Sequence, residues 1–146
     1  MRANFSHTAH EKKLIERLLR LARQALRHAH SPYSGIKVGA AVLTKNGHVH
    51  TGCNVENASY GGTICAERVA ISSAVASGDI SPQRKITAIL ITTNQREIWP
   101  PCGICRQFLA EFSSPNTAIY CMNSRGQMRR SMFSEIFPDA FDAQFL

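Results

Sequence analysis

The sequence predicts an α/β fold, in which a mixed β-sheet of about five strands carries helices on both faces. Helical and strand patterns alternate along the 146 residues, as expected when helices cover a sheet. The dipeptide Asn46-Gly47 separates two apolar runs, which is typical of a β-hairpin turn. The β-branched run from Ile86 to Thr93 predicts a strong strand. The length of the chain suits a single domain over residues 1–146.

The first half of the chain predicts a helix, a hairpin and a second helix. Leucines and alanines recur at helical spacing in the first segment, and Ser31-Pro32-Tyr33-Ser34-Gly35 ends it. Gly78 ends the second, alanine-rich helix. The predicted elements are a helix from His10 to about His30, strands Val38–Leu43 and His48–Cys53, a loop over 54–63, and a helix over Cys65–Ser77.

The second half of the chain predicts three further strands and two short helices. The turn Ser124-Arg125-Gly126 separates the last two strands. The predicted elements are a strand over Ile86–Thr93, a helix over Cys102–Phe112, strands Ala118–Met122 and Gln127–Ser131, and a helix over Met132–Phe137.

The formal net charge is +7, and part of it lies in the first predicted helix. A positive surface of this kind can attract nucleic acid. However, no aromatic residues interleave with these charges, and the charges fall on the polar side of the helical pattern. We therefore expect a solvated helix face and no nucleic-acid partner. The residues are Lys12, Lys13, Arg17, Arg20, Arg23 and Arg27.

Cysteine usage and hydropathy bear on the location of the protein. Residues 1–10 are polar and lack the apolar run of a signal peptide. No apolar stretch reaches the ~20 residues that cross a membrane, so we expect no membrane partner. Five cysteines are an odd number, and three of them have metal-ligand spacing. This pattern favours a reducing, cytoplasmic location over a disulfide framework.

Two cysteine clusters are the strongest chemical signal: Cys65-Ala66-Glu67 and Pro101-Cys102-Gly103-Ile104-Cys105. Thiolates bind Zn²⁺ well, and three protein ligands leave a fourth position for water, as in catalytic zinc sites. Glu67 follows the first thiol by two positions and is placed to transfer protons for that water. The pattern Cys-x-Glu…Pro-Cys-x-x-Cys is a signature of zinc nucleobase deaminases.

Three thiolates make a zinc centre net negative, so a neighbouring positive group is expected. Each cysteine cluster lies at the predicted start of a helix, where amide dipoles favour negative charge. Arg68 is a second candidate, because it follows Cys65 by three positions and can donate to a thiolate. The alternatives are that Arg68 is an ordinary surface charge and that Glu67 only stabilises a helix start.

A non-enzymatic zinc module is the alternative from a different class. Such a module needs a fourth protein ligand in place of water. The sequence offers Cys53, Cys121, His48 and His50 for that position.

Several further segments resemble the small, homotetrameric, zinc-dependent cytidine deaminases. The resemblance runs from about Glu11 to the C-terminus and implies the three-layer fold of that family. It also implies hydrolytic deamination of cytidine and 2′-deoxycytidine in pyrimidine salvage, with one Zn²⁺ per subunit. The segments that carry it are 31–34 (SPYS), 38–41 (VGAA), 52–60 (GCNVENASY), 65–68 (CAER), 101–107 (PCGICRQ) and 138–141 (PDAF).

The resemblance also implies roles for individual residues. Cys65, Cys102 and Cys105 bind zinc, and Glu67 is the acid–base residue. By the same resemblance, Asn54 and Glu56 contact the ribose 3′-hydroxyl, and the Ala66 backbone N–H contacts the pyrimidine, in the site of their own subunit. The residues expected to contact the substrate of a neighbouring subunit are Ala58, Tyr60 and Phe141.

One position departs from the family pattern. Ile36 occupies the position where the family usually has phenylalanine packed on the pyrimidine ring. Isoleucine keeps the apolar contact but lacks ring stacking, which is worth about 0.5–1.5 kcal/mol beyond burial. A modified cytosine nucleoside, such as a blasticidin-type antibiotic, is an alternative substrate, since the enzymes that act on it share the zinc motif. The Asn54 and Glu56 pair favours an ordinary ribose instead. Polynucleotide editing is disfavoured, because the chain lacks an aromatic-rich basic groove.

Overall fold

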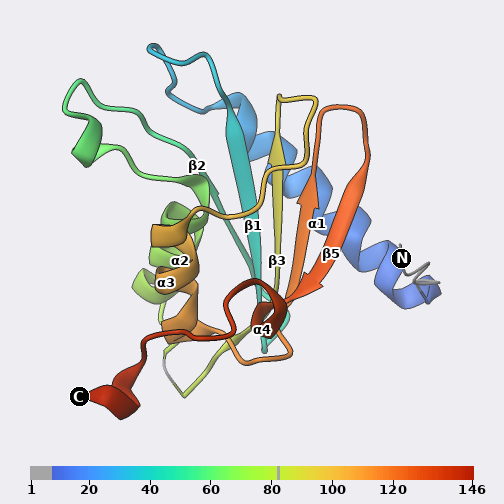
Figure 1. Ribbon diagram of the computed structural model, residues 1–146. Coiled ribbons are helices and arrows are strands. Elements are labelled where there is room, and N and C mark those ends of the chain that lie inside the picture. Colours follow the sequence, from blue (N-terminus) through green and yellow to red (C-terminus); the bar gives the residue numbers. More distant parts are fainter. Residues whose placement is uncertain (1–7, 82) are drawn as a thin grey trace.

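The computed structural model of the chain describes residues 8–81 and 83–146. The elements are α1 Ala9–Arg27, β1 Val38–Thr44, β2 Val49–Cys53, η1 Tyr60–Gly62, α2 Ala66–Ala76, β3 Ile86–Thr93, α3 Gly103–Phe112, β4 Ala118–Met122, β5 Met128–Met132, α4 Phe133–Ile136 and η2 Ala143–Phe145. Within these residues, five strands form a mixed sheet in the order β2-β1-β3-β4-β5. Helix α1 covers one face of the sheet, and α2 and α3 cover the other (Figure 1). The predicted α/β fold with helices on both faces is confirmed.

The first helix is shorter than its apolar pattern predicts. It begins after Thr8, whose hydroxyl accepts a hydrogen bond from the Glu11 N–H, and it ends at Arg27 rather than near His30. The reason is tertiary pairing: the His30 N–H donates to Asn54 O at 3.1 Å, and its carbonyl accepts from the Glu56 N–H at 2.8 Å. Because of these bonds, His30 lies outside the helix and pairs with the loop that follows β2.

The predicted hairpin joins β1 to β2. Thr44 and His48 close it through a 2.9 Å bond from the Thr44 N–H to the His48 carbonyl. The loop therefore has Lys45, Asn46 and Gly47 at its tip. Gly47 has φ 83°, which a residue with a side chain rarely adopts, so a glycine is needed to turn the chain here.

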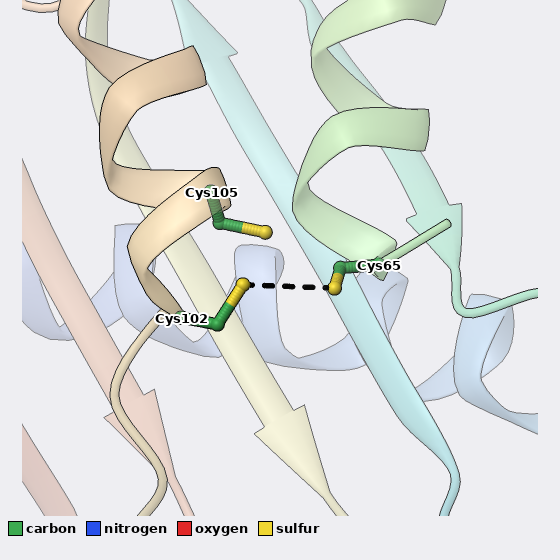
Figure 2. A group of neighbouring side chains, drawn as sticks. All are labelled: Cys65, Cys102 and Cys105. Carbon is green, nitrogen blue, oxygen red and sulfur yellow. Dashed lines mark hydrogen bonds between the residues drawn. The ribbon is translucent and has the colours of Figure 1, made fainter. Parts of the chain in front are cut away.

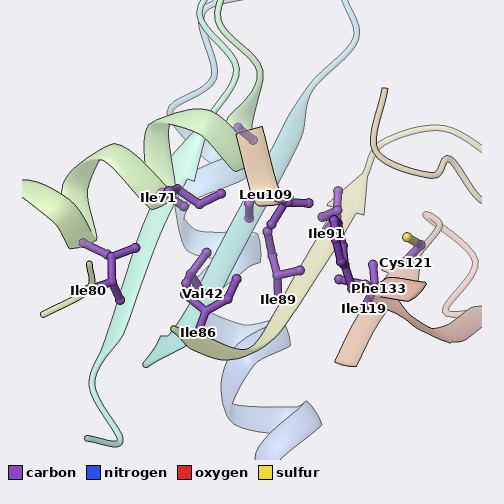
Figure 3. Packing of buried hydrophobic residues seen from close by; sticks show 14 residues of the cluster. Val42, Ile71, Ile80, Ile86, Ile89, Ile91, Leu109, Ile119, Cys121 and Phe133 are labelled. Carbon is purple, nitrogen blue, oxygen red and sulfur yellow. The ribbon is translucent and has the colours of Figure 1, made fainter. Parts of the chain in front are cut away.

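Alternate residues of β3 point to opposite faces of the sheet. Ile89 and Ile91 pack under α2 and α3, whereas Ala88 and Leu90 pack against α1. Figure 3 shows the first of these two clusters, in which Ile71 and Leu109 from the helices cover the sheet. Because the centre of this strand is buried on both faces, its sequence is apolar without interruption from Ala88 to Ile91.

Strand direction explains why the starts of α2 and α3 meet. Strands β1 and β2 are antiparallel, β1 and β3 are antiparallel, and β3 and β4 are parallel. Strands β2 and β3 therefore run in the same direction, and each leads to a helix on the same face of the sheet. The chain enters both helices near the carboxyl ends of these strands, the usual location of ligand sites in α/β sheets.

A close approach between β2 and α2 sets the position of the second helix. A Cβ atom on Gly52 would lie 2.5 Å from both Ala66 O and Ala70 N. The absence of a side chain at Gly52 lets the first turn of α2 lie directly on the strand. The residues at the start of α2 are thus positioned by backbone contact.

None of the described helices has both the length and the apolar character needed to cross a membrane. The prediction that residues 1–10 carry no signal peptide lies mostly outside the described residues.

Candidate metal centre and active site

Three cysteines converge at the starts of α2 and α3. Cys65 is the residue that precedes α2, Cys102 precedes α3, and Cys105 lies in the first turn of α3. Their sulfur atoms all lie within 4.8 Å of one another, and the Cys65 and Cys102 sulfurs are 3.9 Å apart. Figure 2 shows the three thiols turned toward a common point. The convergence of two helix starts on one thiol cluster was predicted from the sequence.

The pKa values of Cys65 and Cys105 are shifted in opposite directions. A hydrogen bond with the Cys105 thiol lowers the pKa of Cys65 to about 5; Arg68 acts in the same direction, while burial opposes it. The same hydrogen bond, together with burial, raises the pKa of Cys105. Cys65 therefore ionises before Cys105, which suits a cluster whose sulfurs bind metal as thiolates.

Arg68 lies beside this negative charge. Its Nη2 donates to Thr63 O at 2.9 Å and lies 4.0 Å from the Cys65 sulfur. Its Nε is buried and has no hydrogen-bond partner among the described residues. The charge of this half-buried guanidinium is compensated when the adjacent sulfurs are ionised. The donor set thus fits a Zn²⁺ ion held by three thiolates.

No fourth His, Cys, Asp or Glu joins the three sulfurs within residues 8–81 and 83–146. The nitrogen atoms of His48 and His50 instead contact Asp79 Oδ2 at 2.9 and 2.6 Å. Burial raises the pKa of Cys121 to about 11, which keeps that thiol protonated. Within the described residues, the non-enzymatic zinc module therefore lacks the fourth ligand it needs, and the cluster keeps a position for water.

Glu67 lies in the first turn of α2, next to the thiol cluster. It is only 4% exposed. Burial raises the pKa of Glu67 to about 7, and the negative charge of Cys65 adds to this rise. A carboxyl group with a pKa near neutrality can both accept and donate a proton at physiological pH.

Asn54 connects the end of β2 to the start of β1. Its Oδ1 accepts from the Val38 N–H, and its Nδ2 donates to Ile36 O, both at 2.8 Å. Each amide atom retains one further hydrogen-bonding position. The structure thus brings Asn54 and Ile36 together, as the predicted substrate contacts require.

Glu56 is held by the preceding turn. Its carboxylate accepts the backbone N–H groups of Tyr33 and Ser34 at 3.0 and 3.2 Å, and also the Ser34 hydroxyl. These bonds, the Ser34 hydroxyl foremost, hold the pKa of Glu56 below its usual value. An ionised carboxylate accepts about four hydrogen bonds, so one position remains for a ligand.

The residues predicted to serve a neighbouring subunit lie at the surface. Tyr60 is 78% exposed and meets Tyr33 edge to face, with ring centres 6.3 Å apart. Phe141 is 55% exposed and stacks on Phe145. Ala58 is exposed as well. These side chains are open to contact from another chain.

Sequence reasoning did not single out two residues that hold the site loops. Arg106 Nε donates to Pro101 O at 2.9 Å and its Nη1 donates to Ile136 O at 3.0 Å, which ties the second cysteine loop to α4. Asn94 accepts from the Lys37 N–H and donates to Gly35 O, which fixes the segment before β1. Arg106 directly follows Cys105, and this adjacency was the available signal.

The sheet, the thiol cluster with three ligands and the adjacent buried carboxyl define a zinc-dependent deaminase domain. The family model described as "Cytidine and deoxycytidylate deaminase zinc-binding region" matches residues 12–122. The chain belongs to this family.

Known proteins support this membership. A cytidine deaminase of Halalkalibacterium halodurans is 42% identical over 127 residues, covering 87% of this chain and 93% of the relative. A cytidine deaminase of Sporosarcina psychrophila is 35% identical, covering 90% and 94%. The crystal structure of the Burkholderia pseudomallei cytidine deaminase superposes with a TM-score of 0.80 at 39% identity, covering 92% of this chain and 100% of that chain.

Proposed function

We propose that this protein catalyses the hydrolytic deamination of cytidine and 2′-deoxycytidine to uridine and 2′-deoxyuridine, with release of ammonia. The observation that carries the proposal is the buried carboxyl of Glu67 beside an open cluster of three thiols. Family membership supports the substrate class. We place the reaction in pyrimidine salvage and the protein in the cytoplasm as one domain over 1–146; the five unpaired cysteines support a reducing location.

Cys65, Cys102 and Cys105 hold the metal. When bound, one Zn²⁺ per subunit supplies a Lewis acid that activates a water molecule for attack on the ring. Arg68 and the two helix starts offset the negative charge of the thiolates. This compensation matters because excess negative charge would oppose the activation of water.

Glu67 moves the protons of the reaction. It takes one proton from the attacking water and delivers it to a ring nitrogen, and then takes the second proton of that water and delivers it to the leaving amine, which departs as ammonia. The burial that raises its pKa to about 7 also keeps bulk water away from these transfers. The Ala66 backbone N–H, at the same helix start, contacts the pyrimidine.

Asn54 and Glu56 bind the ribose 3′-hydroxyl. Their unused positions comprise one amide donor, one amide acceptor and one carboxylate acceptor, which satisfy both roles of a hydroxyl. The backbone bonds that already hold the two side chains orient them before substrate arrives. Ile36 provides the apolar contact with the pyrimidine ring.

The test is the loss of cytidine absorbance, with ammonia measured in parallel, on zinc-loaded protein. Glu67→Gln keeps the shape of the side chain but removes the proton carrier. We expect turnover to fall by about 10⁴-fold, at the upper end of general acid–base effects, with zinc content unchanged. Glu97→Gln, at an exposed position, is the control and should match the wild type. Near-normal turnover of zinc-loaded Glu67→Gln would disprove the assignment.

We further propose that the working unit is a homotetramer whose subunits share active sites through Ala58, Tyr60 and Phe141. The support is the apolar surface these segments expose: Tyr60, Phe141, Phe145 and Leu146 are all more than half exposed. Large apolar side chains exposed in this way favour contact with another chain.

Deletion of residues from Asp139 onward distinguishes two hypotheses about the C-terminal tail. In one the tail completes the active site of a neighbouring subunit, and in the other it packs only on its own subunit. We expect severe loss of activity with zinc retained, because the tail contacts its own subunit mainly at the surface, as in the 2.7 Å bond from Gln107 Nε2 to Phe141 O. Light scattering after size-exclusion chromatography measures the assembly. A fully active monomer would contradict the tetramer proposal.

A further inference from the structure

A groove of about 660 Å³ lies on the α1 face of the sheet, opposite the thiol cluster. Helix α1 forms one wall, and the carboxyl ends of the parallel strands β3 and β4 form the other. Figure 1 shows α1 crossing behind these strands. We call this feature the α1 groove. The residues that carry the argument are Arg20, Arg23 and Arg27 on the helix, and Thr92, Asn94 and Asn123 at the strand ends.

The helix wall of the α1 groove is strongly basic. Arg20, Arg23 and Arg27 are exposed, and Glu16 is the one acidic residue that lines the groove within the described chain. None of the three arginines has an ion pair or hydrogen bond with any residue in 8–81 or 83–146. Their spacing of three and four residues places them on one side of α1 over about 10 Å. Their donors are therefore available to one extended anion.

The strand wall is polar. Thr92 lines the groove and is 2% exposed as a residue, and its hydroxyl has no hydrogen-bond partner among the described residues. Strand alternation directs Thr92 to the α1 side, as for Leu90. Asn94 is held by Gly35 and Lys37, and Asn123 donates to Arg96 O at 2.6 Å. Polar side chains at the strand ends that face a row of unpaired arginines indicate a polar ligand.

The size and lining of the groove narrow the ligand class. A volume of about 660 Å³ is that of a small-molecule site. Among the described residues, no aromatic side chain lines the groove, so these residues offer no stacking surface to the bases of a nucleic-acid strand. Three arginines spread along 10 Å match several linked phosphates better than one.

We propose that the α1 groove binds a small molecule bearing a polyphosphate chain, with Arg20, Arg23 and Arg27 on the phosphates and Thr92 as a neutral donor. This site is separate from the deaminase site and does not depend on the function proposed for it. It accounts for Arg20, Arg23 and Arg27 of the basic run in the sequence, which the deaminase chemistry leaves unused.

The test is calorimetric titration of the zinc-loaded full-length protein with inorganic tripolyphosphate at about 0.15 M salt, where diffuse surface attraction is screened. We expect saturable binding, and weaker binding of orthophosphate. Arg23→Glu and, separately, Arg20→Glu should weaken tripolyphosphate binding by about tenfold or more, as expected for losing a charge-assisted hydrogen bond. Lys13→Glu is the matched control: it makes the same charge change on α1 outside the groove and should stay within about twofold.

Three results would overturn the proposal. One is the absence of saturable binding. Another is an equal loss in Arg23→Glu and Lys13→Glu, which would mean diffuse attraction to the helix. A third is a single-stranded oligonucleotide that binds more tightly than tripolyphosphate and loses affinity in all three variants, which would indicate an extended nucleic-acid surface. Zinc content is measured after each titration. If the titration heat persists in Arg23→Glu and zinc is lost, the heat comes from extraction of zinc by tripolyphosphate and not from binding in the α1 groove.

Discussion

Gly52→Ala tests whether backbone contact between β2 and α2 positions the catalytic carboxyl. The new Cβ would lie 2.5 Å from Ala66 O and Ala70 N, whereas ordinary contacts begin at 3.4 Å. Both atoms belong to the helix backbone and cannot rotate away. Helix α2 must therefore withdraw from the strand by about 0.9 Å, the difference between 3.4 and 2.5 Å, and Cys65 and Glu67 move with it.

The size of the effect follows from this displacement. Overpacking of a well-packed contact costs about 1–3 kcal/mol of stability. At about 2–4 °C per kcal/mol for a chain near this length, the melting temperature should fall by about 2–12 °C. A misplacement near 1 Å lowers catalytic efficiency by about 10²-fold, so kcat/KM for cytidine should fall by about that factor.

Calorimetric melting, zinc content and initial deamination rates measure the three consequences. Gly61→Ala is the control for stability and zinc, because a Cβ on Gly61 meets no atom within 4 Å. We expect this control to melt at or near the wild-type temperature. If Gly52→Ala has the same melting temperature as Gly61→Ala and keeps the wild-type kcat/KM, the backbone contact at Gly52 does not position the site.

Three further predictions concern the metal, the base and pH. Cys102→Ala should lower both zinc content and melting temperature, because the ion links the starts of two helices; full zinc occupancy would reject this ligand. Ile36→Phe should tighten cytidine binding by about tenfold at most, the scale of one stacking contact; unchanged or weaker binding would mean that the pocket is built around isoleucine. Hydrogen bonds from His48 and then His50 hold the pKa of Asp79 below its usual value. Its stabilisation is therefore present above the unfolded pKa of about 3.9 and is lost as pH falls through the lower folded pKa. Asp79→Asn should lower the urea midpoint at pH 7, and the difference should shrink at pH 3; an equal difference at both pH values would contradict this reasoning.

Local patterns were sufficient for the elements of the fold. The run Ile86–Thr93 is the observed β3 without any change of bounds, because β-branched residues dominate it and its centre, Ala88–Ile91, is buried on both faces. The thiol spacing and the position of Glu67 also required no tertiary information, since both are properties of a few neighbouring residues. Errors occurred at ends such as His30, where hydrogen bonds to Asn54 and Glu56 compete with the helix.

Contacts between distant segments were beyond the reach of such patterns. The family resemblance implied that Glu56 contacts a ribose. It did not predict the three hydrogen bonds that the Glu56 carboxylate accepts from Tyr33 and Ser34, more than 20 residues earlier. Nothing local indicates that Asn94 holds Gly35 and Lys37, because a loop asparagine has many partners available to it.

The amino-acid order alone thus determined which residues can bind metal and carry protons, since ligand type and helix phase depend on near neighbours. Packing across the sheet decided where those groups meet. Cys65 and Cys102 are 37 residues apart, and their sulfurs come within 3.9 Å because β2 and β3 run in the same direction and deliver α2 and α3 to one face. The α1 groove arises in the same way on the opposite face, where a basic helix meets two strand ends. Both sites depend on the order of strands in the sheet, which no short stretch of sequence encodes.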